Sequence, residues 1–125
     1  MPIQVKNHKI LQNLLAVPYH KNLIQLICWV AFRYVNHTKP LVITSGYRDG
    51  DSGVHGLKPC RGMDIRSYVF DNPAEIVDDI NNYFEYDPKR PHLNCALLHD
   101  SGSGEHIHLQ AMARTVYHKN GRSKQ

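Results

Sequence analysis

Two histidines near the C-terminal end of the chain are spaced so that both can serve one chemical site. His106 and His108 flank a single apolar residue, Ile107. On a β-strand, residues two positions apart project from the same face, so the two imidazoles would stand together while Ile107 faces the core. Imidazole is a common metal ligand and also carries protons near neutral pH. The pair therefore indicates metal binding or catalysis on a strand.

A second pair of ligand-type residues occurs earlier in the chain. His55 lies in a polar, glycine-bearing segment, and Asp64 follows nine positions later in a predicted strand, residues 62–67. Imidazole nitrogen and carboxylate oxygen are both zinc ligands, and a catalytic zinc ion takes three protein ligands and keeps one position open. One ligand on a loop and one on the next strand can share a metal ion with a third ligand from elsewhere.

Zinc-dependent hydrolysis also requires a base, because the attacking water must lose a proton. Glu105 precedes the histidine pair and lies three positions before His108. On a regular strand its side chain would face away from His108, so it reaches the site only where the strand begins with a bend or bulge near Gly104. The alternative for Glu105 is a solvated side chain at a turn.

Helical elements are predicted in the first third of the chain. Apolar residues recur there at helical spacing, which indicates a short helix ending near Pro18 and a second helix over residues 19–36. The second helix is expected to place Cys28, Trp29 and Phe32 in the core.

Strands and one more helix follow. Short runs rich in apolar and β-branched residues predict strands at 41–44, 62–67, 95–99 and 106–113. The last two form a hairpin around the glycine-bearing loop 100–104. A helix is predicted from Pro73 to about residue 84, with Asp71 or Asn72 as its N-cap. This order is typical of an α+β domain with a small, largely antiparallel sheet, on which N-terminal helices and one further helix pack.

The composition agrees with one folded domain. The 125 residues are 42% hydrophobic and 21% charged, close to globular averages, which argues against extensive disorder. A single domain over residues 1–125 is expected, with 1–18 and 118–125 at its periphery. No apolar run approaches the ~20 residues of a membrane span. The N-terminus lacks the pattern of a cleaved secretory signal, so we expect synthesis in the cytoplasm.

The charge of the chain bears on its partners. The net charge is +4 and the isoelectric point is about 9.0, which suits an anionic partner such as nucleic acid, a membrane surface or a bacterial wall. A nucleic-acid-binding domain would carry a dense stripe of Lys and Arg, whereas the basic residues here are dispersed. We therefore expect no nucleic-acid partner, and we expect a monomer.

The order of these motifs resembles the M15-type zinc peptidases, which form a wider group with the lysostaphin-type enzymes and the hedgehog signalling domain. The pieces that carry the resemblance are Ser45-Gly46-Tyr47-Arg48, His55, Arg61-Gly62-Met63-Asp64 and Glu105-His106-Ile107-His108. The resemblance implies one zinc ion per chain, held by His55, Asp64 and His108.

The same resemblance implies roles for three further residues. Glu105 matches the catalytic carboxylate, and His106 matches a histidine that assists catalysis or orients the water. Arg48 matches an arginine that could polarise the scissile carbonyl or hold a substrate carboxylate in a bidentate contact. The alternative for Arg48 is a structural arginine beneath the loop.

The spacing of the first two ligands departs from the family pattern. Eight residues separate His55 from Asp64, where the family has six, and Cys60 occupies the position of an expected glycine. A loop can absorb two residues without moving its ends far. Cys60 stays an alternative ligand in place of His55, because thiolate binds zinc well.

The register of the last motif also has an alternative. Some M15 enzymes carry HVE or HVD where this chain has HIH. In that register His106 would be the ligand and Ser103 would occupy the position of the base. Serine is a poor base, which favours His108 as the ligand and Glu105 as the base.

The resemblance implies a zinc-dependent peptidase that hydrolyses stem peptides of bacterial peptidoglycan, at a D-alanyl-D-alanine or L-alanyl-D-glutamate type of bond. A basic surface suits an anionic wall. The small size, without an export signal or a wall-binding module, fits a phage-encoded lysin that is made in the cytoplasm and acts at the bacterial cell wall. Two alternatives are a non-catalytic zinc- or peptide-binding module of the same fold and a small nucleic-acid-binding domain.

Overall fold

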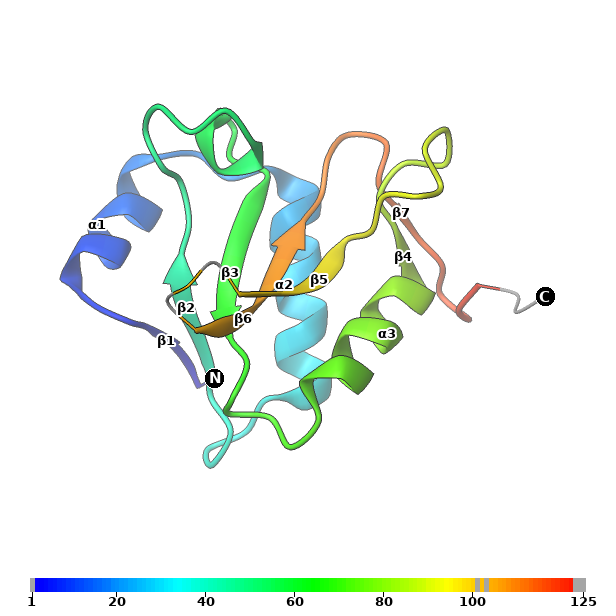
Figure 1. Cartoon of the computed structure of the whole chain (residues 1–125), viewed down its shortest axis with the longest axis horizontal. Coiled ribbons are helices and arrows are strands. Elements are labelled where there is room, and N and C mark those ends of the chain that lie inside the picture. The colour runs from blue at the N-terminus through cyan, green and yellow to red at the C-terminus, as the bar shows by residue number, and fades with distance from the viewer. Residues whose placement is uncertain (1, 101, 103, 123–125) are drawn as a thin grey trace.

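Helices pack on one face of a mostly antiparallel β-sheet (Figure 1). The computed structural model describes residues 2–100, 102 and 104–122. Its elements are β1 (Ile3–Val5), α1 (His8–Ala16), α2 (Lys21–Tyr34), β2 (Leu41–Ser45), the 3-10 helix η1 (Val54–Gly56), β3 (Gly62–Arg66), α3 (Pro73–Tyr83), β4 (Phe84–Glu85), β5 (Ala96–Asp100), β6 (Glu105–Gln110) and β7 (Val116–Tyr117). None of these helices combines the length and hydrophobicity that crossing a membrane requires.

The main sheet has the strand order β1-β2-β3-β6-β5 among the described residues. β1 pairs in parallel with β2, and the other neighbours in this sheet pair antiparallel. β4 and β7 form a separate, smaller antiparallel pair. The predicted α+β class with a largely antiparallel sheet is confirmed. β1, β4 and β7 were not predicted, because segments of two or three residues are too short to show a period.

The core lies between the sheet and helices α2 and α3. α2 buries five residues against it, namely Leu23, Leu26, Ile27, Val30 and Ala31. The strands contribute alternate residues, which are Met63 and Ile65 of β3 and Ile107 and Leu109 of β6. Because successive side chains of a strand point to opposite faces, the residues between them project from the other face of the sheet. That face carries Asp64, His106 and His108.

The predicted core position of two α2 residues is wrong. Phe32 is 78% exposed and Cys28 is also exposed. Trp29, by contrast, is half-buried, and its ring centroid lies 5.4 Å from that of Phe84 in an edge-on contact. Apolar residues occupy most of the circumference of α2, so their spacing did not reveal which stripe faces the sheet.

The N-terminal segment contacts the rest of the fold, although α1 buries no residue fully. β1 extends the sheet beside β2, and Ile10 and Leu14 of α1 pack against the core. The Asn13 side chain donates to the carbonyl of Tyr47 at 2.7 Å and accepts from the N–H of Tyr47 at 3.1 Å. At the other end, residues 118–122 also make hydrogen bonds to the fold, and residues 123–125 lie outside the described part of the chain.

Candidate metal centre

Asp64 and His108 face each other across the neighbouring antiparallel strands β3 and β6. The N–H of Ala111 donates to the carbonyl of Arg61 at 3.0 Å. By the alternation of the ladder, Asp64 and His108 form a pair without mutual backbone hydrogen bonds, and in such pairs the side chains approach most closely. Nδ1 of His108 lies 2.9 Å from Oδ1 of Asp64. Regular strand pairing therefore brings two ligand atoms into contact.

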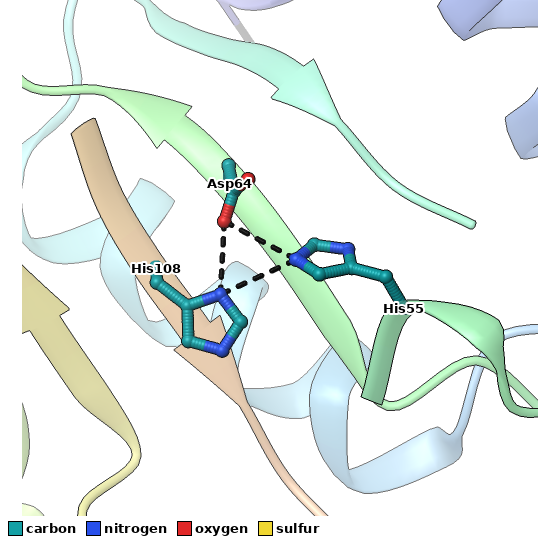
Figure 2. A group of neighbouring side chains, drawn as sticks. All are labelled: His55, Asp64 and His108. Carbon is teal, nitrogen blue, oxygen red and sulfur yellow. Dashed lines mark hydrogen bonds and ion pairs between the residues drawn. The ribbon is translucent and has the colours of Figure 1, made fainter. Parts of the chain in front are cut away.

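His55 reaches the same point from the loop between β2 and β3. The 3-10 helix η1 carries it, and the loop can turn tightly because a Cβ on Gly56 would lie 1.8 Å from the carbonyl oxygen of Asp51. The His55 side chain is buried, and its Nδ1 donates to the carbonyl of Gly46 at 2.7 Å. Nε2 faces Asp64 and His108 (Figure 2), and in the neutral imidazole this bond leaves Nε2 with a lone pair.

The three ligand atoms form a small triangle. Its sides are 2.9 Å from Asp64 to His108, 3.3 Å from His108 to His55 and 3.4 Å from His55 to Asp64. A tetrahedral ion with bonds of about 2.1 Å requires ligand atoms about 3.4 Å apart. Among the described residues, these three are the group of potential ligands that lie close enough to hold one metal ion. The donor atoms are thus already near the spacing that a tetrahedral ion requires.

Asp64 supplies the negative charge of the cluster. Its carboxyl group is buried, and burial by itself raises the pKa of a carboxyl group. Hydrogen bonds from the imidazoles of His108 and His55 in their protonated forms, together with the positive charge of those forms, act in the opposite direction and hold the Asp64 pKa well below its ordinary value. The carboxylate is therefore ionised at neutral pH and attracts a cation to the cluster.

A pocket of about 460 Å³ lies over the cluster and gives access to it. Besides the three ligands, its walls include Arg48, Asp51, Val54, Leu97, His99, His106 and Gln110. Leu97 and His99 come from β5, so the pocket extends from the η1 loop across the exposed face of β6 to the edge strand. A substrate in this pocket would lie beside a metal ion held by the cluster.

His106 and Arg48 both lie near Oδ2 of Asp64, the carboxylate oxygen that is not part of the ligand triangle. Nε2 of His106 lies 3.5 Å from Oδ2 of Asp64, while its Nδ1 lies 3.4 Å from the carbonyl oxygen of Gly104. The Arg48 side chain is 52% exposed, and its guanidinium lies 4.0 Å from Oδ2 of Asp64 and 3.4 Å from Asp51. The Arg48 side chain therefore lies at the rim of the pocket, while its backbone N–H supports the loop by donating to the carbonyl of His55 at 2.7 Å.

Glu105 is the predicted site residue that the structure does not bring to the pocket. The pairing of β5 with β6 runs without a register shift from Ala96 to Asp100, which pairs with Glu105, so β6 is regular at Glu105. The Glu105 side chain points to the face opposite the histidines and is exposed. Its backbone carbonyl accepts a hydrogen bond from Ser67 at 2.9 Å. This geometry favours the interpretation of Glu105 as a solvated side chain.

Two alternatives from the sequence can be compared with the structure. The thiol of Cys60 is buried and donates to the carbonyl of Gly62 at 3.3 Å, and it is not part of the ligand cluster that includes His55. Burial also raises the pKa of the Cys60 thiol, which disfavours the thiolate. Residues 57–59, which follow η1, are exposed. Ser103, the base in the alternative register, lies outside the described residues.

His99 and Gln110 are further polar side chains of the pocket, and Gln110 was not among the residues predicted from the sequence. The ring of His99 meets that of His106 edge-on, with centroids 5.3 Å apart. Gln110 contacts His108, and Nε2 of His108 lies 3.1 Å from Oε1 of Gln110. Strand alternation could have indicated Gln110, since it continues the series 106, 108, 110. The position of His99 required the hairpin register, in which it pairs with His106.

Comparisons of the chain with protein-family models, with curated proteins and with solved structures find no match. The resemblance to M15-type zinc peptidases therefore rests on the motifs between residues 45 and 108. A proposal for the function depends on those motifs, on the geometry of the ligand cluster and on the chemistry of the pocket around it.

Proposed function

We propose that this chain is a zinc-dependent peptidase in which His55, Asp64 and His108 hold the metal ion. The observation that carries the proposal is the triangle of ligand atoms, with sides of 2.9–3.4 Å, beneath an accessible pocket. Structural zinc sites are closed by four protein ligands, whereas three ligands beside a pocket suit a catalytic site. A zinc ion bound there would lower the pKa of a water molecule and polarise a carbonyl oxygen.

His106 is the residue placed to move protons. Its Nδ1 is turned toward the carbonyl of Gly104, which leaves Nε2 free to accept a proton on the side of the pocket near Asp64. In hydrolysis, His106 would accept a proton from the attacking water and return it to the departing amine as the C–N bond breaks. General acid–base catalysis of this kind contributes about 10²–10⁴-fold to the rate. His106 thus takes the role that the resemblance assigns to Glu105.

Arg48 is the residue placed to recognise the substrate. It is a half-exposed cation at the rim of the pocket, 4.0 Å from the Asp64 carboxylate. A guanidinium in this position can donate to the oxygen of a scissile carbonyl or bind a substrate carboxylate through two parallel hydrogen bonds. Both contacts would orient a peptide over the ligand cluster.

We further propose that the substrate is the stem peptide of bacterial peptidoglycan, cut at a D-alanyl-D-alanine or L-alanyl-D-glutamate type of bond. The support for this is the motif resemblance, together with a net charge of +4 that suits an anionic wall. The protein would act at the cell wall, as a phage-encoded lysin does.

Metal content and hydrolysis together test the proposal. Elemental mass spectrometry of the untagged protein should find about one zinc per chain, and His108→Ala should lose it. His106→Ala should retain zinc but hydrolyse synthetic stem peptides about 10²–10⁴-fold more slowly. His37→Ala is the matched control, because His37 is exposed and outside the pocket. A native chain that takes up no zinc during dialysis against the metal would refute the metal site.

A non-catalytic module of the same fold is the second candidate. The observation that favours it is the position of Glu105, whose carboxylate faces away from the pocket. Such a module would bind zinc and stem peptide without releasing product, and His106→Ala would leave both affinities unchanged. Loss of hydrolysis with retained zinc in His106→Ala would instead support the peptidase.

A further inference from the structure

Gln110 connects the metal cluster to a neighbouring backbone segment. It is the last residue of β6 and lies on the same face as His108, two positions earlier. Oε1 of Gln110 lies 3.1 Å from Nε2 of His108, and its side-chain nitrogen donates to the carbonyl of Asn94 at 2.7 Å. The side chain of Gln110 is therefore held at both of its polar atoms.

These two contacts place a hydrogen-bond acceptor opposite Nε2 of His108. A backbone carbonyl can only accept hydrogen bonds, so the NH₂ group of Gln110 must face Asn94, and its oxygen must face His108. That oxygen is also only an acceptor, so the hydrogen bond requires a proton on Nε2 of His108. A neutral imidazole has one N–H, which leaves a lone pair on Nδ1, the atom 2.9 Å from Asp64 and 3.3 Å from His55.

We propose that Gln110 is a positioning residue, which selects the tautomer of His108 that presents Nδ1 to the metal ion. This inference rests on the proposed metal site. The carbonyl of Gly46 selects the other tautomer for His55. It accepts a hydrogen bond from Nδ1–H, so that Nε2 of His55 presents its lone pair to the cluster. Partners of this kind commonly fix the orientation and tautomer of histidine ligands.

The position of Asp64 explains why His108 needs such a partner. Oδ1 of Asp64 lies 2.9 Å from Nδ1 of His108, so the carboxylate attracts a proton onto the nitrogen that must bind the metal. Gln110 offers a competing acceptor at Nε2 and stabilises the ligand tautomer. Without that acceptor, His108 would pair with Asp64 through Nδ1–H, and this hydrogen bond would have to break before metal binding.

The test compares Gln110→Met with Gln110→Glu in the full chain. Both variants lose the donor to the carbonyl of Asn94, but methionine also lacks a strong acceptor, whereas glutamate keeps a carboxylate oxygen that can accept from Nε2–H. Gln25→Met is the matched control, because Gln25 is exposed on α2. Zinc affinity is measured by competition with a chelator, and the His108 Nε2–H proton of the zinc-loaded proteins is followed by NMR. Thermal unfolding of the metal-free proteins reports whether each variant is folded.

We expect Gln110→Met to bind zinc about 10–100-fold more weakly and to lose the protected Nε2–H signal. Gln110→Glu should bind within a few-fold of the native chain and retain the signal. Equal zinc affinity in Gln110→Met and the native chain would overturn the inference, as would equal losses in both Gln110 variants. Failure of the proposed function would be distinguishable from failure of this inference, because in that case the native chain itself would bind no zinc. A Gln110→Met variant that does not fold leaves Gln110→Glu to decide: weak binding by that variant overturns the inference.

Discussion

Replacing Gly62 by alanine should disturb the metal site without changing a ligand. Gly62 begins β3 and is buried beneath the loop that carries His55. A Cβ added there would lie 2.5 Å from Cγ2 of Val54 and 3.4 Å from Cε1 of His108. Val54 directly precedes His55, so the new methyl group would push on the segment that carries His55, while its contact with His108 would be an ordinary one.

The size of the effect follows from these distances. Carbon atoms in contact are normally about 3.5–4.0 Å apart, so Val54 would have to move by roughly 1 Å. Metal–ligand distances tolerate only about 0.2 Å, so a comparable shift of His55 would open the ligand triangle. Overpacking of this kind costs about 1–3 kcal/mol, and for a domain of this size each kcal/mol lowers the Tm by about 4 °C.

Thermal unfolding of the metal-free protein and a chelator competition measure the two consequences. We expect the Tm of Gly62→Ala to fall by about 4–12 °C and its zinc affinity to fall by at least about tenfold. Gly53→Ala is the control, because its Cβ would meet only the movable carboxylate end of Asp51, at 3.2 Å. A Gly62→Ala variant with native Tm and native zinc affinity would refute the argument that Val54 closes tightly over this glycine.

Three further predictions concern the support of the site and the rest of the fold. Asn13→Ala removes both hydrogen bonds to the segment after β2, so urea unfolding should show a loss of about 1–3 kcal/mol, and native stability would argue against the role of α1. Hydrogen bonding from Arg90 holds the pKa of buried Asp87 below its ordinary value. The contribution of Asp87 to stability is then complete above about pH 4 and is lost as the pH falls through the lower folded-state pKa. The destabilisation of Asp87→Asn in urea should therefore be largest near neutral pH and shrink below about pH 4, and a pH-independent difference would contradict this. Burial raises the pKa of the Cys95 thiol to about 12, so iodoacetamide near pH 8 should modify exposed Cys28 and spare Cys95 in the folded protein, as peptide mass spectrometry can show. Rapid modification of Cys95 would contradict its burial.

Local patterns predicted a large part of the fold. The helix from Pro73 was predicted with its N-cap, and the side chain of Asn72 does accept from the N–H of Glu75. The β5–β6 hairpin was also predicted, within one to three residues at its ends. These features depend on neighbouring residues, through capping, fixed proline geometry and strand alternation. Such local interactions are present in the sequence itself.

The errors arose where a side chain's environment depends on a distant element. Phe32 is as apolar as the residues of α2 that are buried, and only the placement of the sheet decides that it is exposed. Glu105 was predicted either to reach the site through a bend near Gly104 or to be a solvated side chain, and its regular pairing with β5 favours the second of these. The spacing of Glu105 from His108 contained no information on that bend.

For the candidate site, the sequence by itself determined the chemistry that is available. His106 and His108 share a face because a strand has a period of two, and His55, Asp64 and His108 have the donor types that a divalent ion prefers. The tertiary structure decided the geometry. The pairing of β3 with β6 brings together residues that lie 44 positions apart, and the η1 loop adds His55, 53 positions from His108. Distances near 3 Å between such remote residues depend on strand register and loop packing, and both arise from long-range contacts that only the folded chain forms.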